Sequence, residues 1–299
     1  MNLLTYLDGT IDQSGKTFLY DIYSGIGDNL WRTTLFREIK RRNPKLKLIV
    51  TAKGNSWKFV FKNNPYIDEL RDLDQNGQLY LDDVDYFVDD KICPHVVANY
   101  GRDKHALDAL EIWSGLKIYD KSYWYEVTKE ENEFADKFMS KIKRPIIGVV
   151  LKSSTWVRTW PFLNTKKLLK MILYAGGSVI VFDNTPFQQR YDNVINMAGN
   201  YNIREIAAVV SKLDMLVAPD SGLLHFGGHF KIPTVGIFGA VPSFCRIGYY
   251  STVIPVEINL PCRPCFAHAY FCKYGIPSPC LAGISTEMVF EKLKSFGIL

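Results

Sequence analysis

Short runs of β-branched and aromatic residues alternate with helical segments along this chain. The chain contains two such series, one after the other. Such runs predict parallel sheets built from βαβ units. A basic connector ending in proline, residues 141–145, separates the two series, so we expect α/β domains over residues 1–143 and 144–299. A cleft facing the carboxyl ends of both sheets is the expected ligand site. The expected strands are 18–23, 47–51, 146–150, 178–182, 215–218 and 234–238.

Composition narrows the class of protein. Apolar residues make up 47% of the 299 residues and charged residues 22%, which is typical of a globular protein. No apolar run approaches the ~18 residues of a membrane span, and the N-terminus lacks the pattern of a secretory signal. We therefore expect a cytoplasmic protein. The net charge of +5 favours phosphate-bearing ligands, anionic lipid surfaces or nucleic acid without choosing between them.

The first candidate site is the turn Gly25-Ile26-Gly27-Asp28, between the first expected strand and helix. Two glycines permit a tight turn and the close approach of a ligand, and a helix N-terminus favours anions. Asp28 either caps the helix or presents a carboxylate to the cleft, and the residues alone favour capping. The third glycine of the dinucleotide-binding fingerprint is missing, because Arg32 stands near its place.

The second candidate site follows an apolar strand of the second domain. Asp220, Ser221 and Gly222 open a helix there, and the backbone N–H groups at Ser221 and Gly222 suit a diphosphate. His225 comes one helical turn later on the same face. The alternative, equally supported by these residues, is that Asp220 only caps the helix and His225 is a buried histidine with an ordinary hydrogen bond.

A third polar segment follows the first strand of the second domain. Its hydroxyls at Ser153 and Ser154, with Lys152 and Arg158, suit phosphate oxygens, and an arginine is a bidentate donor to them. A polar loop whose two tryptophans pack against the sheet is the alternative, and this segment taken alone favours it.

Four cysteines lie near the C-terminus within a loop, residues 255–282, that shows little helical or strand pattern. Disulfides are disfavoured in a reducing compartment, whereas four thiolates suit a closed tetrahedral zinc or iron site. His268 is a possible replacement for one ligand, and unligated thiols are the alternative. The expected metal ligands are Cys262, Cys265, Cys272 and Cys280.

Together these segments resemble glycosyltransferase family 9, which includes the ADP-heptose:lipopolysaccharide heptosyltransferases. The similarity extends over roughly residues 17–284 and is most continuous in the second domain. Arg158 occupies a position where this family usually has lysine. The matching stretches are Gly25 to Asp28, Arg158 to Pro161, 197–199 with 203–208, Asp220 to His225, and Pro233 to Gly239.

The resemblance implies a GT-B architecture, with an acceptor-side and a donor-side Rossmann-like domain. It implies an inverting transfer from a nucleotide diphosphate-sugar to a hydroxyl acceptor without a catalytic metal. Asp28 becomes the general base, and a subgroup of the family binds iron at similar cysteines. The implied donor-binding residues are Ser153, Ser154, Arg158, Asp220, Ser221, Gly222 and His225.

A glycan or lipopolysaccharide-type acceptor is favoured, and contact with a membrane surface is compatible with it. Two other functions are open. One is a glycosyltransferase of the same fold that modifies DNA bases, which the positive charge and a short first domain permit. The other is a non-catalytic module that binds nucleotide-sugars. Asp28 discriminates against this module, because a binding protein needs no base in the turn.

Overall fold

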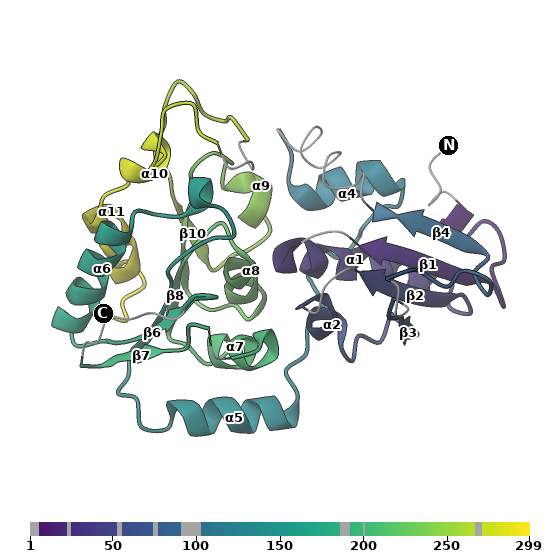
Figure 1. Cartoon of the computed structure of the whole chain (residues 1–299), viewed down its shortest axis with the longest axis horizontal. Helices are drawn as coiled ribbons and strands as arrows, with labels where there is room; N and C mark the ends of the chain where they lie inside the picture. Colours follow the sequence, from purple (N-terminus) through teal and green to yellow (C-terminus); the bar gives the residue numbers. More distant parts are fainter. Residues whose placement is uncertain are drawn as a thin grey trace. The chain divides into compact units, whose positions relative to one another are not determined.

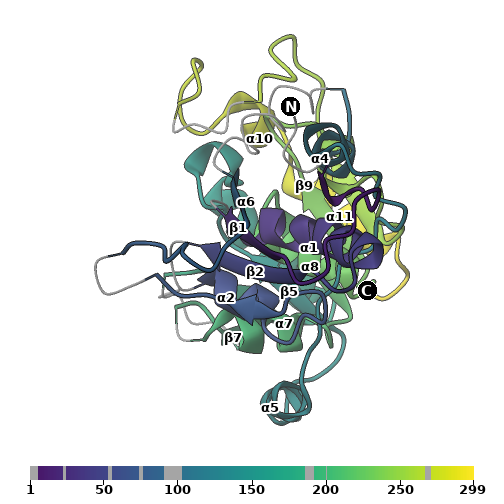
Figure 2. The same cartoon turned by 90° about the vertical axis from the view of Figure 1, so that its right-hand side faces the viewer.

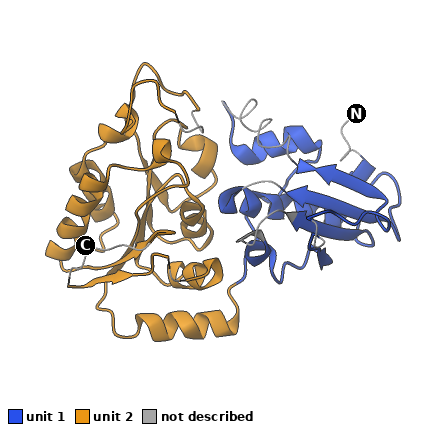
Figure 3. Ribbon diagram, in the orientation of Figure 1, with its two compact units in different colours: residues 1–126 blue, residues 127–299 orange. Residues whose placement is uncertain are grey.

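The protein consists of two compact units, residues 1–126 and residues 127–299 (Figures 1 and 3). The computed structural model describes residues 6–22, 25–52, 56–73, 77–90, 103–185, 192–199, 201–266 and 271–299. Across these ranges no helix is long and apolar enough to cross a membrane.

Unit 1 is built on a parallel four-stranded sheet with the order β3-β2-β1-β4. The chain passes from β1 outward to β3 and then returns to place β4 on the other side of β1. The order of the strands therefore reverses between β1 and β4. Its elements are β1 (Thr17–Ile22), α1 (Ile26–Arg42), β2 (Lys47–Ala52), α2 (Ser56–Phe61), β3 (Glu69–Leu70), β4 (Tyr86–Asp89) and α4 (Ala106–Ser114).

Aromatic side chains join α1 to the sheet of unit 1. The rings of Tyr20 and Phe36 are 5.3 Å apart in an edge-to-face arrangement, and those of Phe36 and Phe61 are 5.6 Å apart. All three side chains are fully buried. Edge-to-face pairs of this kind add about 0.5–1.5 kcal/mol to the hydrophobic gain. These ring contacts fix α1, whose first turn carries Asp28.

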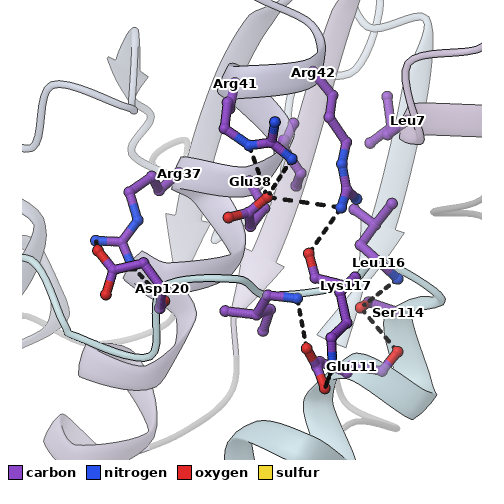
Figure 4. Close-up of polar contacts among 12 residues, drawn as sticks. Leu7, Arg37, Glu38, Arg41, Arg42, Glu111, Ser114, Leu116, Lys117 and Asp120 are labelled. Carbon is purple, nitrogen blue, oxygen red and sulfur yellow. Dashed lines mark hydrogen bonds and ion pairs between the residues drawn. The ribbon is translucent and has the colours of Figure 1, made fainter.

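The last turns of α1 are tied to the segment that follows α4 (Figure 4). Arg42 Nη2 lies 3.7 Å from the carboxylate of the buried Glu38 and donates to the carbonyl oxygen of Lys117 at 2.8 Å. Arg37 Nη2 donates to the carbonyl oxygen of Asp120 at 2.6 Å. Basic side chains also suit the negative end of the helix dipole. These contacts hold the C-terminal end of α1 within unit 1.

Unit 2 contains a parallel six-stranded sheet with the order β10-β9-β8-β5-β6-β7, and its strand order reverses between β5 and β8. The strands β5, β6, β8 and β9 are buried along their whole length, as expected of a parallel sheet covered on both faces. The elements are α5 (Lys129–Met139), β5 (Ile146–Val150), a 3-10 turn (Trp156–Arg158), α6 (Phe162–Tyr174), β6 (Ser178–Phe182), β7 (Val194–Asn196), α7 (Ile203–Val210), β8 (Met215–Pro219), α8 (Gly222–His229), β9 (Thr234–Ile237), α9 (Phe244–Ile247), β10 (Val253–Val256), α10 (Pro279–Ala282) and α11 (Thr286–Lys294).

The boundary between the units differs from the one expected at residue 143. Residues 127–143 group with unit 2, because α5 lies beside α7 (Figures 1 and 2). The Glu131 carboxylate accepts hydrogen bonds from Arg204 Nε at 2.7 Å and Nη2 at 2.8 Å. The same carboxylate accepts the backbone N–H of Thr128 and so caps α5.

Most expected strands and helices are present, and the differences concern short elements. The expected strands at 47–51, 146–150, 178–182, 215–218 and 234–238 correspond to observed strands within one residue at each end. The three-residue β7 and the four-residue α9, α10 and β10 were not expected, because elements this short show no periodicity. Helix α1 begins at Ile26, three residues earlier than expected, and so includes Gly27 and Asp28.

Candidate active site

Two polar segments of unit 2 meet at the point where its strand order reverses. Ser153 follows β5 and Asp220 follows β8, and these two strands are direct neighbours in the sheet. Parallel strands end at the same edge of a sheet, and ligands of open α/β sheets bind at the reversal point. The second and third candidate sites of the sequence are therefore parts of one group.

Arg158 and Ser153 join the two segments directly. Ser153 Oγ donates to the carbonyl oxygen of Asp220 at 2.7 Å, and Arg158 Nη1 lies 3.5 Å from Asp220 Oδ2. Arg158 Nη2 donates to Ser154 Oγ at 2.6 Å, so the guanidinium and both hydroxyls form one cluster. The side chain of Asp220 is only 7% exposed. Hydroxyls and a guanidinium at one sheet edge are suited to the oxygens of a phosphate.

Ser221 stands at the N-cap position of α8, directly before Gly222. Serine at this position usually accepts a backbone N–H of the first turn, but here it makes no such bond. Its Oγ is buried and has no hydrogen-bond partner within the ranges that the structure describes. A helix N-terminus favours anions. The Ser221 hydroxyl beside the helix start is therefore suited to an anionic ligand.

His225 is buried one turn further along α8 and lies close to Tyr250. Its Nδ1 is 3.1 Å from the Tyr250 hydroxyl oxygen. A Cβ added at Gly228 would come within 2.5 Å of the Tyr250 ring, so a residue without a side chain is required there. The contact with Tyr250 agrees with the alternative interpretation of His225 as a buried, hydrogen-bonded histidine. Tyr250 has no motif of its own, and sequence reasoning missed it.

Two further charged contacts surround this group and were not expected. Arg246, on α9, places its Nε 3.7 Å from Asp220 Oδ1, so Asp220 has a guanidinium near each of its oxygens. Lys152 Nζ lies 3.0 Å from the carboxylate of Asp183, which follows β6. An ion pair with an acid already occupies Lys152, which the sequence offered as a phosphate donor. The sequence offered one indication that Asp183 lies near the site, which is its position directly after a strand.

Asp28 lies in the first turn of α1, in unit 1. It is the third residue of the helix, and Gly25 is the N-cap. The backbone N–H of Gly25 donates to Asp28 Oδ2 at 3.3 Å, so the carboxylate does contribute to capping from inside the helix. Arg32 Nη1 donates to the carbonyl oxygen of Asp28 at 2.9 Å, and its Nε forms a buried ion pair with Asp90, which follows β4. Gly27 lies within the same helical turn.

The four candidate metal ligands have different surroundings. None of the five cysteines that the structure describes forms a disulfide. Cys280 is buried, Cys265 is exposed, and Cys262 and Cys272 are half-buried. Burial raises the pKa of the Cys280 thiol, the Arg263 guanidinium lowers it, and the other three thiols raise it. Over the described ranges, no three His, Cys, Asp or Glu side chains are arranged to hold a metal ion. His268 lies outside the described residues.

Comparisons with known proteins identify the family of this chain. The profile of glycosyltransferase family 9 (heptosyltransferase) matches residues 88–273. Over 162 residues the chain is 20% identical to the lipopolysaccharide core heptosyltransferase OpsX of Haemophilus influenzae, covering 50% of this chain and 44% of OpsX. The chain spans less than half the length of the curated relatives it matches.

Two solved structures share the fold over nearly the whole chain. A glycosyltransferase family 9 protein from Veillonella parvula has a TM-score of 0.68 and 15% identity, covering 96% of this chain and 98% of that one. The dodecameric iron-containing heptosyltransferase TibC, in complex with ADP-D-beta-D-heptose, has a TM-score of 0.71 and 12% identity. The match covers 96% of this chain and 78% of the TibC chain.

The two parallel α/β units and these neighbours define a GT-B fold of two Rossmann-like domains. Since the family profile matches more than half of the chain, the chain belongs to glycosyltransferase family 9, the heptosyltransferase family.

Proposed function

We propose that this chain is an inverting glycosyltransferase that moves a sugar from a nucleoside diphosphate-sugar to a hydroxyl group. The observation that carries the proposal is the convergence of Ser153, Ser154 and Arg158 with the start of α8 at the reversal point of the unit 2 sheet. Membership in family 9 supports the same reaction class. Unit 2 is then the donor side and unit 1 the acceptor side.

The donor's diphosphate binds at the edge where β5 and β8 end. Arg158 and the hydroxyls contact its oxygens, and the N–H groups of Ser221 and Gly222 face it from the helix start. As the bond between the anomeric carbon and the diphosphate oxygen breaks, the electron pair leaves with the diphosphate. Fixed positive charge and N–H dipoles stabilise the negative charge that develops there. This leaving-group stabilisation needs no metal.

Asp28 acts as the general base in this proposal. The acceptor hydroxyl oxygen forms the new bond to the anomeric carbon while its proton passes to the Asp28 carboxylate. Attack on the face opposite the departing diphosphate inverts the anomeric configuration. The ion pair of Arg32 with Asp90 and the bond from Arg32 to the Asp28 carbonyl hold the helical turn that carries the base.

The donor and acceptor are proposed from the relatives. A related structure contains ADP-D-beta-D-heptose, so an ADP-linked heptose is the first donor to test. The relatives include lipopolysaccharide core and lipooligosaccharide heptosyltransferases, so a glycan of that type is the proposed acceptor. The comparisons offer no support for a nucleic acid acceptor. A cytoplasmic location stays a prediction.

We also propose one structural zinc or iron ion in the cysteine loop, residues 255–282. Four thiolates are chemically suited to either metal, and the similar TibC structure is described as iron-containing. Among the described residues, these thiols do not form a coordination group. The expected ligands are Cys262, Cys265, Cys272 and Cys280. No step of the reaction depends on this ion.

A binding and turnover experiment tests the function. Calorimetry with ADP, UDP and GDP identifies the nucleoside diphosphate, and the matching nucleotide-sugars are then incubated with truncated lipopolysaccharide acceptors while release of the diphosphate is measured. The expected result is binding of one diphosphate and its release in an acceptor-dependent reaction. Binding without any turnover on any acceptor would favour the non-catalytic module, and absence of all binding would refute the donor site.

A further inference from the structure

The segment that follows β9 connects the donor site to the cysteine loop. Its far end carries α9, from which Arg246 reaches Asp220. Its near end is bonded to the cysteine loop, since the backbone N–H of Phe266 donates to the carbonyl oxygen of Ala240 at 3.1 Å. Gly239 lies beside Cys280, because a Cβ added there would be 3.1 Å from Cys280 Sγ. One short stretch of chain therefore touches both regions.

Arg246 adds a second positive charge at the buried carboxylate of Asp220. Arg246 Nε is 3.7 Å from Oδ1, and Arg158 Nη1 is 3.5 Å from Oδ2. Both distances exceed the roughly 2.7–2.9 Å of a close charged hydrogen bond. Two guanidinium groups therefore flank one carboxylate. Guanidinium groups near the Ser221 hydroxyl are suited to the oxygens of a phosphate.

Glu257 fixes the chain at the start of α9. Its Oε1 accepts a hydrogen bond from Ser243 Oγ at 2.8 Å, and its Oε2 accepts the backbone N–H of Ser243 at 3.2 Å. Ser243 is the N-cap of α9 and is buried. A carboxylate bound twice to one residue restricts both the position and the direction of the short helix that follows. Arg246 is the third residue of that helix.

Arg263 of the cysteine loop holds Glu257 in turn. Its Nη2 donates to Glu257 Oε2 at 2.7 Å, and its Nη1 donates to the carbonyl oxygen of Ile258. The side chain of Arg263 is only 8% exposed although it lies between Cys262 and Cys265. A continuous series of hydrogen bonds thus runs from Arg263, between two of the cysteines, through Glu257 to the start of α9.

We propose that Arg246 is a second guanidinium for the donor's diphosphate, and that Glu257, held by Arg263 of the cysteine loop, positions it. The proposal rests on the proposed donor site in unit 2 and adds two residues to it. Arg246 contacts the ligand, whereas Glu257 acts through α9 without touching it.

Calorimetric titration with ADP, with UDP and GDP run beside it, tests the first half. Arg246→Met weakens ADP binding about 10- to 100-fold, the loss expected for a hydrogen bond to a charged group, and Arg246→Lys weakens it less. Arg144→Met is the matched control, since Arg144 pairs with Asp214 at the opposite end of β8, with Nη2 3.0 Å from Oδ1. The control binds ADP like the parent.

A double-mutant cycle tests the second half. Glu257→Gln keeps the size of the side chain and lowers ADP affinity about fivefold. A change of this size lies within the range of interaction energies measured between residues in contact. In the Arg246→Met background the same change has no further effect, because the group that Glu257 positions is gone. A purely structural role predicts equal losses in both backgrounds, and that result overturns the positioning role.

The outcomes also separate this inference from the proposed function. If the parent binds none of the three nucleotides, the donor site itself is refuted, and Arg246 with it. If Arg158→Met weakens ADP binding and folded Arg246→Met does not, the donor site stands and the role of Arg246 is overturned. Circular dichroism and the melting temperature of each variant establish that it is folded.

Discussion

Arg158 Nη1 lies 3.5 Å from Asp220 Oδ2, although 62 positions separate the two residues in sequence. The contact exists because β5 and β8 are neighbours at the reversal point of the sheet, so the segments that follow them share one edge. Asp220 holds Arg158 beside the start of α8, where backbone N–H groups already favour an anion.

Arg158→Ala is expected to weaken nucleoside diphosphate binding by about 1.5–3 kcal/mol, the usual contribution of a hydrogen bond to a charged group. The substitution also removes the guanidinium near Asp220 Oδ2, whereas Arg246 stays near Oδ1. Isothermal titration calorimetry with ADP measures the loss. Arg144→Ala serves as control at the opposite edge of the sheet, and equal affinities of the two variants would contradict the role of Arg158.

Asp28→Asn is expected to keep the fold and donor binding but lower turnover by at least ~10²-fold, the low end of general-base contributions. Asparagine still has an oxygen to accept the Gly25 N–H, so the helix start is retained while the base is lost. Steady-state kinetics and calorimetry on the same preparation measure both effects. A variant that turns over like the parent, or that fails to bind the nucleotide, would show that Asp28 is not the base.

The long buried strands and the donor-side motif could be predicted from the sequence, for a physical reason. Fully buried parallel strands are continuous apolar runs, and a ligand site at their ends requires polar residues directly after them. Ser153 and Asp220 satisfy both conditions, so the sequence already suggests that they are close.

The missed features depend on three-dimensional packing. Arg246 lies on a four-residue helix without periodicity, and its relation to Asp220 depends on β9 lying beside β8. The start of α1 was expected too late because glycine is a poor helix former, yet Gly27 lies inside the helix. The domain boundary was expected after α5, since the contact of Glu131 with Arg204 spans 73 positions and leaves no local signal.

Protein purified without added metal is expected to contain about one zinc or iron ion per chain, since four thiolates complete a tetrahedral site. Inductively coupled plasma mass spectrometry measures the stoichiometry. Cys262→Ser with Cys265→Ser lowers it below a tenth of an equivalent, whereas Cys245→Ser, a buried cysteine of α9, leaves it unchanged. Metal-free parent protein whose thiols all titrate in the native state would rule the ion out.

In metal-free, reduced protein, Cys280 is expected to be alkylated at least ~10-fold more slowly than Cys265, because the thiolate is the reactive form. Burial raises the pKa of Cys280, so a smaller fraction is thiolate at pH 8, whereas Cys265 is exposed. The Cys280 rate rises as the pH approaches its raised pKa. Mass spectrometry of iodoacetamide-treated protein at several pH values measures both rates. Equal rates at pH 8 would contradict the described burial of Cys280.

Glu131→Ala is expected to lower the free energy of unfolding by about 3–5 kcal/mol, the loss found when one partner of a buried ion pair is removed. The carboxylate accepts two hydrogen bonds from Arg204, whose side chain is 4% exposed, and also caps α5. Glu133→Ala is the matched control on the same helix, because Glu133 is 67% exposed and lies 3.8 Å from Lys129. Its expected loss is at most about 0.5 kcal/mol, as for an exposed helical pair.

Urea unfolding followed by circular dichroism compares the two variants with the parent. The larger loss for Glu131→Ala arises because Arg204 stays buried after its carboxylate is removed, and because α5 loses its cap. Nucleotide affinity is expected to stay at the parent value in folded Glu131→Ala, since the pair of Glu131 and Arg204 joins α5 to α7. Equal stabilities of the two variants would show that α5 is not anchored to unit 2 by this pair, and the boundary at residue 143 would then be preferred.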